Sequence, residues 1–196
     1  MNKMTPDLPA RRPAICVFCG SSQGSDPAYA EAAARFGTLL VQNDFDLVFG
    51  GGGVGLMGEV AASVARSNGK ILGIIPNFLK HLEPPLHVAS QIVVTETMND
   101  RKAQMFAACD GFAVLPGGLG TLDEFFEALT YAQLHLHEKP IVIVNVKNYF
   151  APLIALIDHM VTHGFAHASA KDLMHVVATP EDAIKVFAAR VAAPVR

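Results

Sequence analysis

The stretch Gly50-Gly51-Gly52-Gly53-Val54-Gly55-Leu56-Met57-Gly58 decides the fold class of this 196-residue chain. It follows a short apolar run at 47–49 and precedes an Ala-rich amphipathic segment that ends near 68–69, so it joins a strand to a helix. On both sides of it, short β-branched runs alternate with longer amphipathic segments. This alternation is typical of βα units on a parallel sheet. We therefore predict an α/β fold, a Rossmann-like doubly wound open parallel sheet in a three-layer αβα arrangement.

The same alternation places the individual elements along the chain. Strands are expected at 14–19, 47–49, 70–75, 92–95, 112–115, 141–146 and 174–177. Helices are expected from 25–27 to 43, from the glycine-rich stretch to 68–69, over 98–109, from 120–121 onward, over 150–163, and from 180 onward. Asp26 before Pro27 is typical of a helix start, because Asp caps the helix and Pro suits its first position.

Composition limits the number of domains and the kinds of partner. A chain with 51% hydrophobic residues fits a single domain, expected over 13–196 after a flexible polar tail at 1–12. A net charge of -3 and a pI near 6.2 argue against nucleic acid as a partner. No apolar run approaches the roughly twenty residues of a membrane span. Three cysteines without a disulfide framework indicate a reducing compartment, which we take to be the cytoplasm.

The segment Gly53-Val54-Gly55-Leu56-Met57-Gly58 matches G-x-G-x-x-G in the context of a strand before it and a helix after it. A dinucleotide site also requires a carboxylate about twenty residues further on, at the end of the next strand. That strand ends at Ile75-Pro76-Asn77, without one, so NAD is not favoured. A mononucleotide or phosphate role for Gly20, Ser21, Gly52 and Gly53 remains open, as does a turn that serves only close packing.

A second glycine-rich turn, at 115–124, indicates an anion site more directly. Its glycines expose backbone amides at the start of a helix, where phosphate is favoured. The alternative is a capping box, in which Thr121 caps the helix and Glu124 satisfies the amide of the cap residue. Arg101 and Lys102 stand near the start of another helix, where the dipole disfavours cations, and this placement suggests that they meet an anion.

Together these residues carry a family resemblance. Arg101-Lys102 with Pro116-Gly117-Gly118-Leu119-Gly120-Thr121-Leu122-Asp123-Glu124 resembles the P-G-G-x-G-T-x-x-E signature of the LOG (Lonely Guy) family. Phe18-Cys19-Gly20-Ser21-Ser22 matches as well, and the likeness covers the chain from residue 12 onward. It implies a Rossmann-like homodimer that hydrolyses cytokinin riboside 5′-monophosphates, and commonly AMP, to free base and ribose 5-phosphate without a cofactor. The family's older label, lysine decarboxylase, does not suit the residues, because no lysine stands in a glycine-rich turn.

The resemblance also implies the roles of individual residues. Arg101 and Glu124 would be the catalytic pair. The substrate-binding residues would be Glu83, Met98, Lys102, Gly117, Gly118, Leu119, Gly120, Thr121, Leu122, Asp123 and Thr130. The loop around Glu83 departs from the family pattern, and Asn99 and Tyr131 replace the His and Trp that are common there.

The chemistry of N-glycoside cleavage suits an ionised carboxylate, which stabilises an oxocarbenium-like transition state. Whether Glu124 acts by its charge, as a base or as a nucleophile is open, as are the proton donor and the need for an N6-prenyl group on adenine. A non-catalytic nucleotide sensor on the same fold is the alternative function.

Other residue patterns predict no further chemistry. Cys16 and Cys19 lie on a strand and point to opposite faces, which favours two core thiols over a redox pair. His159 and His163 share a helical face, but no third ligand is evident, so no metal is expected. The segment 130–136 carries more apolar residues than one buried face requires, which agrees with a homodimer.

Overall fold

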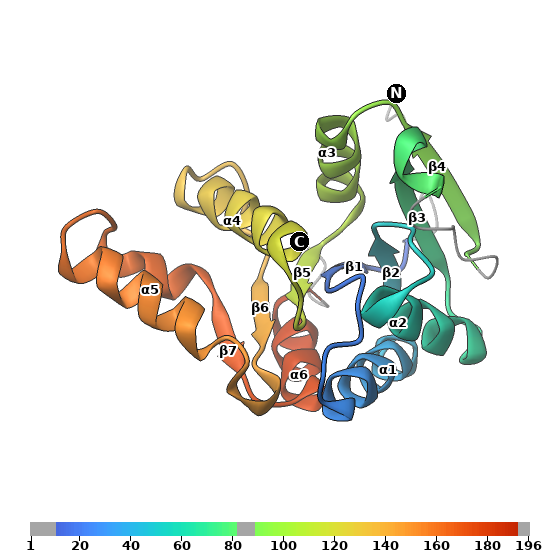
Figure 1. Cartoon of the computed structure of the whole chain (residues 1–196), viewed down its shortest axis with the longest axis horizontal. Helices are drawn as coiled ribbons and strands as arrows, with labels where there is room; N and C mark the ends of the chain where they lie inside the picture. The colour runs from blue at the N-terminus through green and yellow to red at the C-terminus, as the bar shows by residue number, and fades with distance from the viewer. Residues whose placement is uncertain (1–10, 82–88, 192–196) are drawn as a thin grey trace, which may run out of the picture.

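The computed structural model describes residues 11–81 and 89–191. Within these ranges the chain contains one sheet of seven strands (Figure 1). The strand order is β4-β3-β2-β1-β5-β6-β7, and every neighbouring pair is parallel. The strands are β1 (Ala14–Phe18), β2 (Asp46–Phe49), β3 (Ile71–Pro76), β4 (Gln91–Thr95), β5 (Gly111–Val114), β6 (Ile141–Val144) and β7 (His175–Val177). This arrangement confirms the predicted Rossmann-like open parallel sheet.

Helices connect the strands. They are α1 (Pro27–Gln42), α2 (Gly55–Arg66), α3 (Met98–Ala108), α4 (Leu119–Gln133), α5 (Ala151–Thr162) and α6 (Pro180–Val191), with short 3-10 helices η1 (Asn77–His81), η2 (Val146–Asn148) and η3 (Ala168–Leu173). The expected strand at 141–146 is shorter than predicted, because the chain turns into η2 after Val144.

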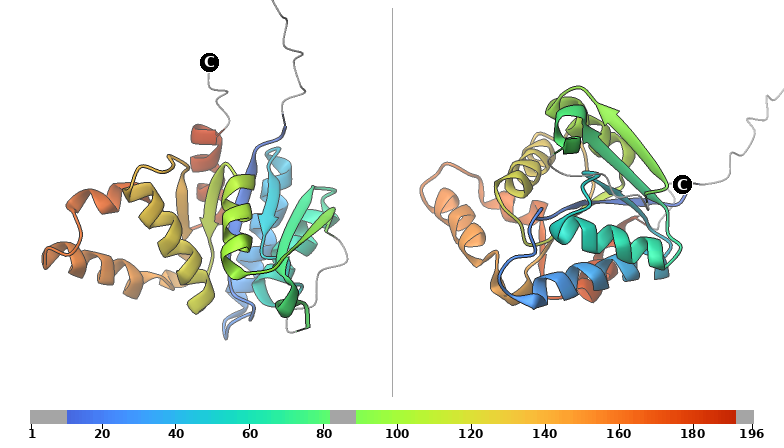
Figure 2. Two further views of the ribbon diagram at one scale, coloured as in Figure 1. Left: turned by 90° about the horizontal axis from the view of Figure 1, so that it is seen from above. Right: turned by 45° about the vertical axis from the view of Figure 1, so that its right-hand side comes forward.

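The helices cover both faces of the sheet. Ile15 and Val17 of β1 pack with α1, α2 and α6, whereas Cys16 and Phe18 pack with α3, α4 and α5. This alternation follows from the two-residue period of a strand. The right-hand view of Figure 2 shows α1 and α2 on one side of the sheet and α3 and α4 on the other. The three-layer αβα arrangement is confirmed.

The connections reverse direction at β1. From β1 the chain builds the sheet outward to β4 and then returns to place β5 on the other side of β1. Phe18 of β1 lies opposite Val114 of β5, so the turns that follow the two strands meet. The amide of Gly20 donates to the carbonyl of Pro116 at 3.0 Å and joins the two turns. In open α/β sheets, ligands bind at this kind of switch point.

The helix starts confirm one prediction and rule out one of the two alternatives for the turn at 115–124. Asp26 caps α1 as expected, since its side chain accepts a hydrogen bond from the amide of Ala28 at 2.9 Å. The capping box at the start of α4 is wrong. The helix begins at Leu119 after an N-cap at Gly118, so Thr121 is its third residue and Glu124 its sixth. Glu124 is therefore too far along the helix to satisfy the cap.

Cysteine placement agrees with the interpretation of core thiols. Cys16 and Cys19 belong to the packing clusters on opposite faces of the sheet, and both are buried, as is Cys109. None of the helices within the described ranges has both the length and the apolar character needed to cross a bilayer.

The last two residues of the predicted tail are held by ion pairs. Arg11 binds Asp110 at 2.9 Å and Arg12 binds Asp44 at 2.9 Å. The first ten residues lie outside the described part, and the boundary at residue 12 stays a prediction.

Close packing of α1 on α2 predicts an unusual response to a glycine substitution. Gly→Ala within a helix normally stabilises a protein by about 1 kcal/mol. At Gly37, however, a Cβ would lie 2.5 Å from the backbone carbonyl of Val60. Because that backbone cannot yield cheaply, Gly37→Ala should lower the free energy of unfolding by about 1–3 kcal/mol in urea denaturation.

Gly120 is the matched control, since it is also helical and a Cβ there would meet nothing within 4 Å. Gly120→Ala should leave stability unchanged or raise it. A Gly37→Ala protein more stable than the parent would contradict the packing argument.

Candidate active site

A cavity of about 240 Å³ opens where the turns after β1 and β5 meet. Its wall combines these two turns with the end of β2 and the helices α3 and α4. The lining residues are Val17, Cys19, Gly20, Ser21, Gly50, Met57, Leu79, Met98, Arg101, Gly118, Leu119, Gly120, Thr121 and Glu124. The site therefore sits at the carboxyl ends of the strands, on the switch point itself.

Two charged side chains face each other in this cavity. Arg101 comes from the second turn of α3 and Glu124 from the second turn of α4. They are only 6% and 7% exposed, and Arg101 Nη2 lies 3.4 Å from Glu124 Oε1. A charge-assisted hydrogen bond of good geometry measures about 2.7–2.9 Å, so this pair is looser than a purely structural ion pair. The sequence-based pairing of these two residues is matched by their positions.

Arg101 also carries an unsatisfied donor. Its Nε is buried and has no hydrogen-bond partner among the described residues. Buried polar groups are almost always hydrogen-bonded, and an exception calls for an explanation such as a missing ligand. Because Arg101 lines the cavity, an acceptor oxygen of a bound molecule is the partner that fits this donor.

Gly50, at the end of β2, makes room for the guanidinium group. A Cβ at this position would overlap Arg101 Nη2. Gly50 was not among the predicted site residues, although it belongs to the glycine run at 50–53. Nothing in that run distinguishes the glycine that borders a distant arginine from those that shape the turn. Gly52 and Gly53, which were selected, do not line the cavity.

The start of α4 supplies the neutral part of the wall. Gly118, Leu119, Gly120 and Thr121 line the cavity, and they include the first helical residues. The amides of a first turn have no acceptor within their own helix. Gly118 offers no side chain to cap them, so this end of the cavity suits an anion.

Lys102 lies outside the cavity lining, where it binds carboxylates of α4. Its Nζ lies 3.0 Å from Asp123 Oδ2 and 2.5 Å from Glu127 Oε2. Burial acts to lower the pKa of Lys102, but the hydrogen bonds to Glu127 and Asp123 outweigh it and raise the pKa above its ordinary value. The carboxylate of Asp123 is thereby paired with a cation outside the cavity lining. Of the two consecutive carboxylates after the glycine-rich turn, only that of Glu124 lines the cavity.

The other predicted site residues divide into two groups. Met98 and Ser21 line the cavity with Gly20, and the Met98 sulfur lies 3.9 Å from Arg101 Nη1. Besides Gly52, Gly53 and Lys102, four more predicted residues are absent from its lining in the described structure, namely Gly117, Leu122, Asp123 and Thr130. Glu83 lies outside the described residues.

Cys19 is a lining residue that the sequence analysis assigned only to the core. Burial, and then the negative charge of Glu124, raise the pKa of its thiol well above the ordinary value. A neutral thiol is a poor nucleophile, so Cys19 contributes shape to the wall.

Histidines form no metal site in the described ranges. The rings of His159 and His163 lie tilted against each other with centroids 3.9 Å apart, and no group of three His, Cys, Asp or Glu side chains suited to a metal ion is found in these ranges.

Comparison with known proteins identifies the family. A protein-family model described as "Possible lysine decarboxylase" matches residues 57–187. Cytokinin riboside 5′-monophosphate phosphoribohydrolase LOG3 of Arabidopsis thaliana is 40% identical over 171 residues, which cover 87% of this chain and 80% of the relative. LOG7 of the same plant is 43% identical over 160 residues, covering 82% and 74%. The chain belongs to the LOG family.

The residues of the cavity do not suit the lysine decarboxylase activity that the family-model description names. A lysine decarboxylase that uses pyridoxal phosphate needs a lysine for the Schiff base. The described lining of the LOG cavity holds an arginine and a glutamate but no lysine.

Solved structures with the LOG fold include more distant proteins. The molybdenum cofactor binding protein of Rippkaea orientalis superposes with a TM-score of 0.73 at 22% identity, covering 92% of this chain and 98% of that chain. The molybdenum cofactor carrier protein of Chlamydomonas reinhardtii gives 0.70 at 19%, covering 93% and 100%. At such identities the likeness concerns the fold alone.

The contact between residue 50 and Arg101 predicts a displacement. Gly50→Ala should move the guanidinium away from Glu124 by about 1 Å or more, because non-bonded carbon and nitrogen atoms keep about 3.5 Å apart. The crystal structure of the variant measures this distance directly. Gly118→Ala is the control, since a Cβ there would meet nothing within 4 Å and Arg101 should stay in place. An unmoved Arg101 in Gly50→Ala would show that the glycine is not needed for this purpose.

Proposed function

We propose that this protein hydrolyses the N-glycosidic bond of cytokinin riboside 5′-monophosphates, and of AMP, to release the free base and ribose 5-phosphate. The observation that carries the proposal is the buried Arg101–Glu124 pair beside the start of α4. The names of the plant relatives support the substrate class. We infer that the reaction takes place in the cytoplasm, which suits three buried free thiols.

The substrate can be oriented by its phosphate. A dianionic phosphate fits the amides at the start of α4, where the helix dipole also favours negative charge. With the phosphate held there, the ribose extends toward Arg101 and Glu124. Binding of the phosphate thus positions the ribose for reaction, which lowers the entropic cost of reaching the transition state.

Glu124 acts at the anomeric carbon. As the bond from C1′ to the base nitrogen breaks, its electron pair leaves with the base, and positive charge develops on C1′ and the ring oxygen. A buried carboxylate stabilises this charge far more than it would in water. The oxygen of a water molecule then bonds to C1′, and one of its protons completes the balance on the released base.

Arg101 holds the substrate. Its guanidinium stays protonated at any working pH, so it binds oxygens of the ribose or phosphate and does not exchange protons. The unpartnered Nε is one donor for this purpose. The same positive charge lies 3.4 Å from Glu124 and offsets part of the cost of burying its carboxylate.

The assay that tests the proposal uses AMP and N6-isopentenyl-AMP, with chromatography of the released base. Glu124→Gln should lower turnover by at least ~10²-fold, because it removes the charge that faces C1′ while it keeps the side-chain shape. AMP should still stabilise the variant thermally, since its binding contacts come mainly from the helix start and Arg101.

Glu127→Gln is the matched control, as it makes the same change three residues further along α4, outside the cavity lining. It should keep most of the parental turnover. If the parent binds AMP and N6-isopentenyl-AMP and releases the free base from neither, the hydrolase proposal is wrong and a nucleotide sensor is the better description.

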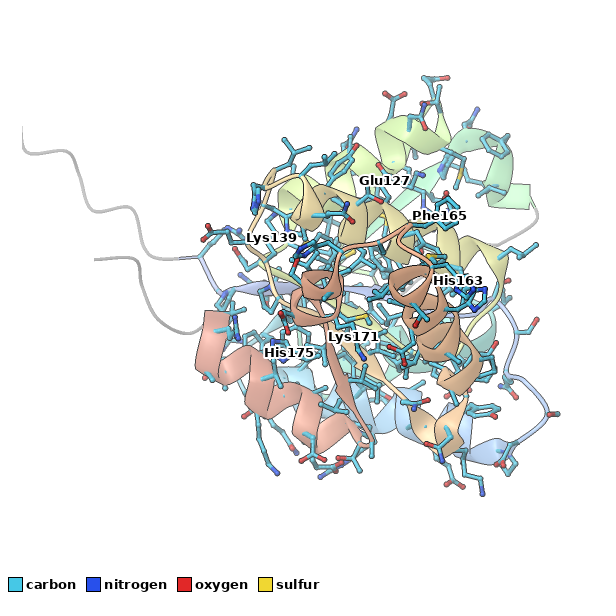
Figure 3. All side chains as sticks on the ribbon, turned by 90° about the vertical axis from the view of Figure 1, so that its left-hand side faces the viewer. Glu127, Lys139, His163, Phe165, Lys171 and His175 are labelled. Carbon is cyan, nitrogen blue, oxygen red and sulfur yellow. The ribbon has the colours of Figure 1, made fainter. Side chains whose placement is uncertain are left out.

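We also propose that the protein is a homodimer that pairs through the end of the molecule formed by α4 and α5. Leu134 and Leu136, after α4, are 59% and 66% exposed, and Phe165, after α5, is 90% exposed. Gln133 and Phe165 border one shallow groove. Figure 3 faces this end of the molecule and labels Phe165. Exposed apolar groups gathered in this way mark an interaction surface.

Light scattering at micromolar concentration should give twice the chain mass of 20.9 kDa. Phe165→Glu should shift the protein toward monomer, because a charge would be buried without a partner. Phe78→Glu, on a 55% exposed aromatic of η1, is the control and should leave the mass unchanged. A parent protein that is monomeric under these conditions would rule the dimer out.

A further inference from the structure

Three successive carbonyls of the turn between β5 and α4, those of Pro116, Gly117 and Gly118, accept hydrogen bonds from within the protein. The carbonyl of Pro116 accepts from the amide of Gly20 at 3.0 Å, and that of Gly118 accepts from Leu122 within the helix at 3.1 Å. A carbonyl aimed at a phosphate would repel it. The hydrogen bonds that hold these oxygens therefore affect how well an anion can bind at the start of α4.

The carbonyl between them, on Gly117, is held by a side chain from a distant segment. Tyr149, just after η2, donates its hydroxyl to this oxygen at 2.6 Å. The contact lies beside a second pocket of about 240 Å³, which shares Gly20, Ser21 and Gly118 with the first. Tyr149 and Gly117 both line this second pocket.

Peptide geometry transmits the contact to the cavity. The carbonyl of one residue and the amide of the next point in opposite directions across a planar trans peptide. When Tyr149 holds the Gly117 carbonyl on its own side, the amide of Gly118 is turned away from it. Glycines at both positions leave this peptide free to rotate, so an external bond is needed to fix it.

The segment that carries Tyr149 is unusually constrained. Lys147 and Asn148 have φ angles of 52° and 58°, a left-handed conformation that is unfavourable for a residue such as lysine. The side chain of Asn145 accepts from the amide of Phe150 at 2.7 Å and closes the segment. Such strain persists only where surrounding structure enforces it, and it is concentrated at functional sites.

The aromatic ring is also fixed from the side. Tyr29 of α1 packs against Tyr149 edge to face, with the ring centroids 5.6 Å apart. Lys147 lies 3.7 Å from Asp26, the cap residue of α1. The position of the hydroxyl is therefore set both by α1 and by the closed segment that carries Tyr149.

We propose that Tyr149 is a positioning residue for the 5′-phosphate of the substrate, acting through the Gly117–Gly118 peptide. The inference rests on the proposed function, in which a phosphate monoester binds at the start of α4. The buried and unpartnered Nε of Arg101, in the same cavity, is independent support for a ligand with acceptor oxygens. Tyr149 itself touches neither the substrate nor the reacting atoms.

Tyr149→Phe removes only the hydroxyl. Tyr149 is 40% exposed, so water can reach the released carbonyl and the variant should fold normally. Calorimetric titration with AMP, ribose 5-phosphate and inorganic phosphate should show affinities weakened about fivefold, the effect of one lost hydrogen bond. Adenosine, which lacks the phosphate, provides the internal comparison, and the ratio of AMP affinity to adenosine affinity should fall by the same factor.

Tyr29→Phe is the matched control, because it removes a hydroxyl from the neighbouring ring of the same pocket without touching Gly117. Its affinity ratio should equal that of the parent. A Tyr149→Phe protein with an unchanged ratio, or with AMP and adenosine weakened equally, would overturn the inference and leave a structural tyrosine.

The two proposals fail in different ways. If the parent binds phosphate and AMP but hydrolyses neither AMP nor N6-isopentenyl-AMP, the proposed activity is wrong, while the affinity ratio still tests Tyr149. If the parent hydrolyses AMP and Tyr149→Phe keeps the parental ratio, the activity stands and the positioning role is wrong. A parent that binds neither inorganic phosphate nor ribose 5-phosphate would refute the phosphate site and the role of Tyr149 together.

Discussion

The parallel pairing of β1 with β5 is the contact on which the site depends. It is the one place in the sheet where strands far apart in sequence become neighbours because the chain has reversed its direction of growth. Ladder hydrogen bonds fix Phe18 against Val114, and the two following turns then meet without further adjustment. One turn brings Ser21 to the cavity and the other brings the start of α4. A shift of this register would separate the parts of the site before any side chain moved.

Burial of Arg101 and Glu124 is costly unless each charge is compensated. Their mutual contact at 3.4 Å compensates in part and leaves donor capacity on the guanidinium. The site thus has the character of a preorganised polar environment, in which groups are held ready for a ligand's charge instead of for each other. Gly50 contributes by the absence of a side chain, since the guanidinium occupies the space where a Cβ would lie.

The sequence alone predicts those features of the structure that depend on a local residue pattern. Strand and helix alternation predicts the sheet, and Asp26-Pro27 predicts the start of α1. The pair Arg101 and Glu124 followed from motif resemblance. Local pattern failed at α4, where Thr121 and Glu124 fit a capping box, but the turn let the helix begin at Leu119. Pattern also could not find Gly50, Tyr149 or the binding of Lys102 by Glu127, because each depends on a partner that tertiary packing brings close.

The salt bridges of Lys102 have a consequence for the speed of encounter with substrate. Because Asp123 and Glu127 bind Lys102, and Arg101 is itself buried, these two cations of α3 project little positive potential into solvent. The chain as a whole carries a net charge of -3. An anionic nucleotide is therefore not drawn in from a distance, as it would be by a basic funnel. Capture depends on short-range fit after an unassisted collision, and the association rate should vary little with ionic strength.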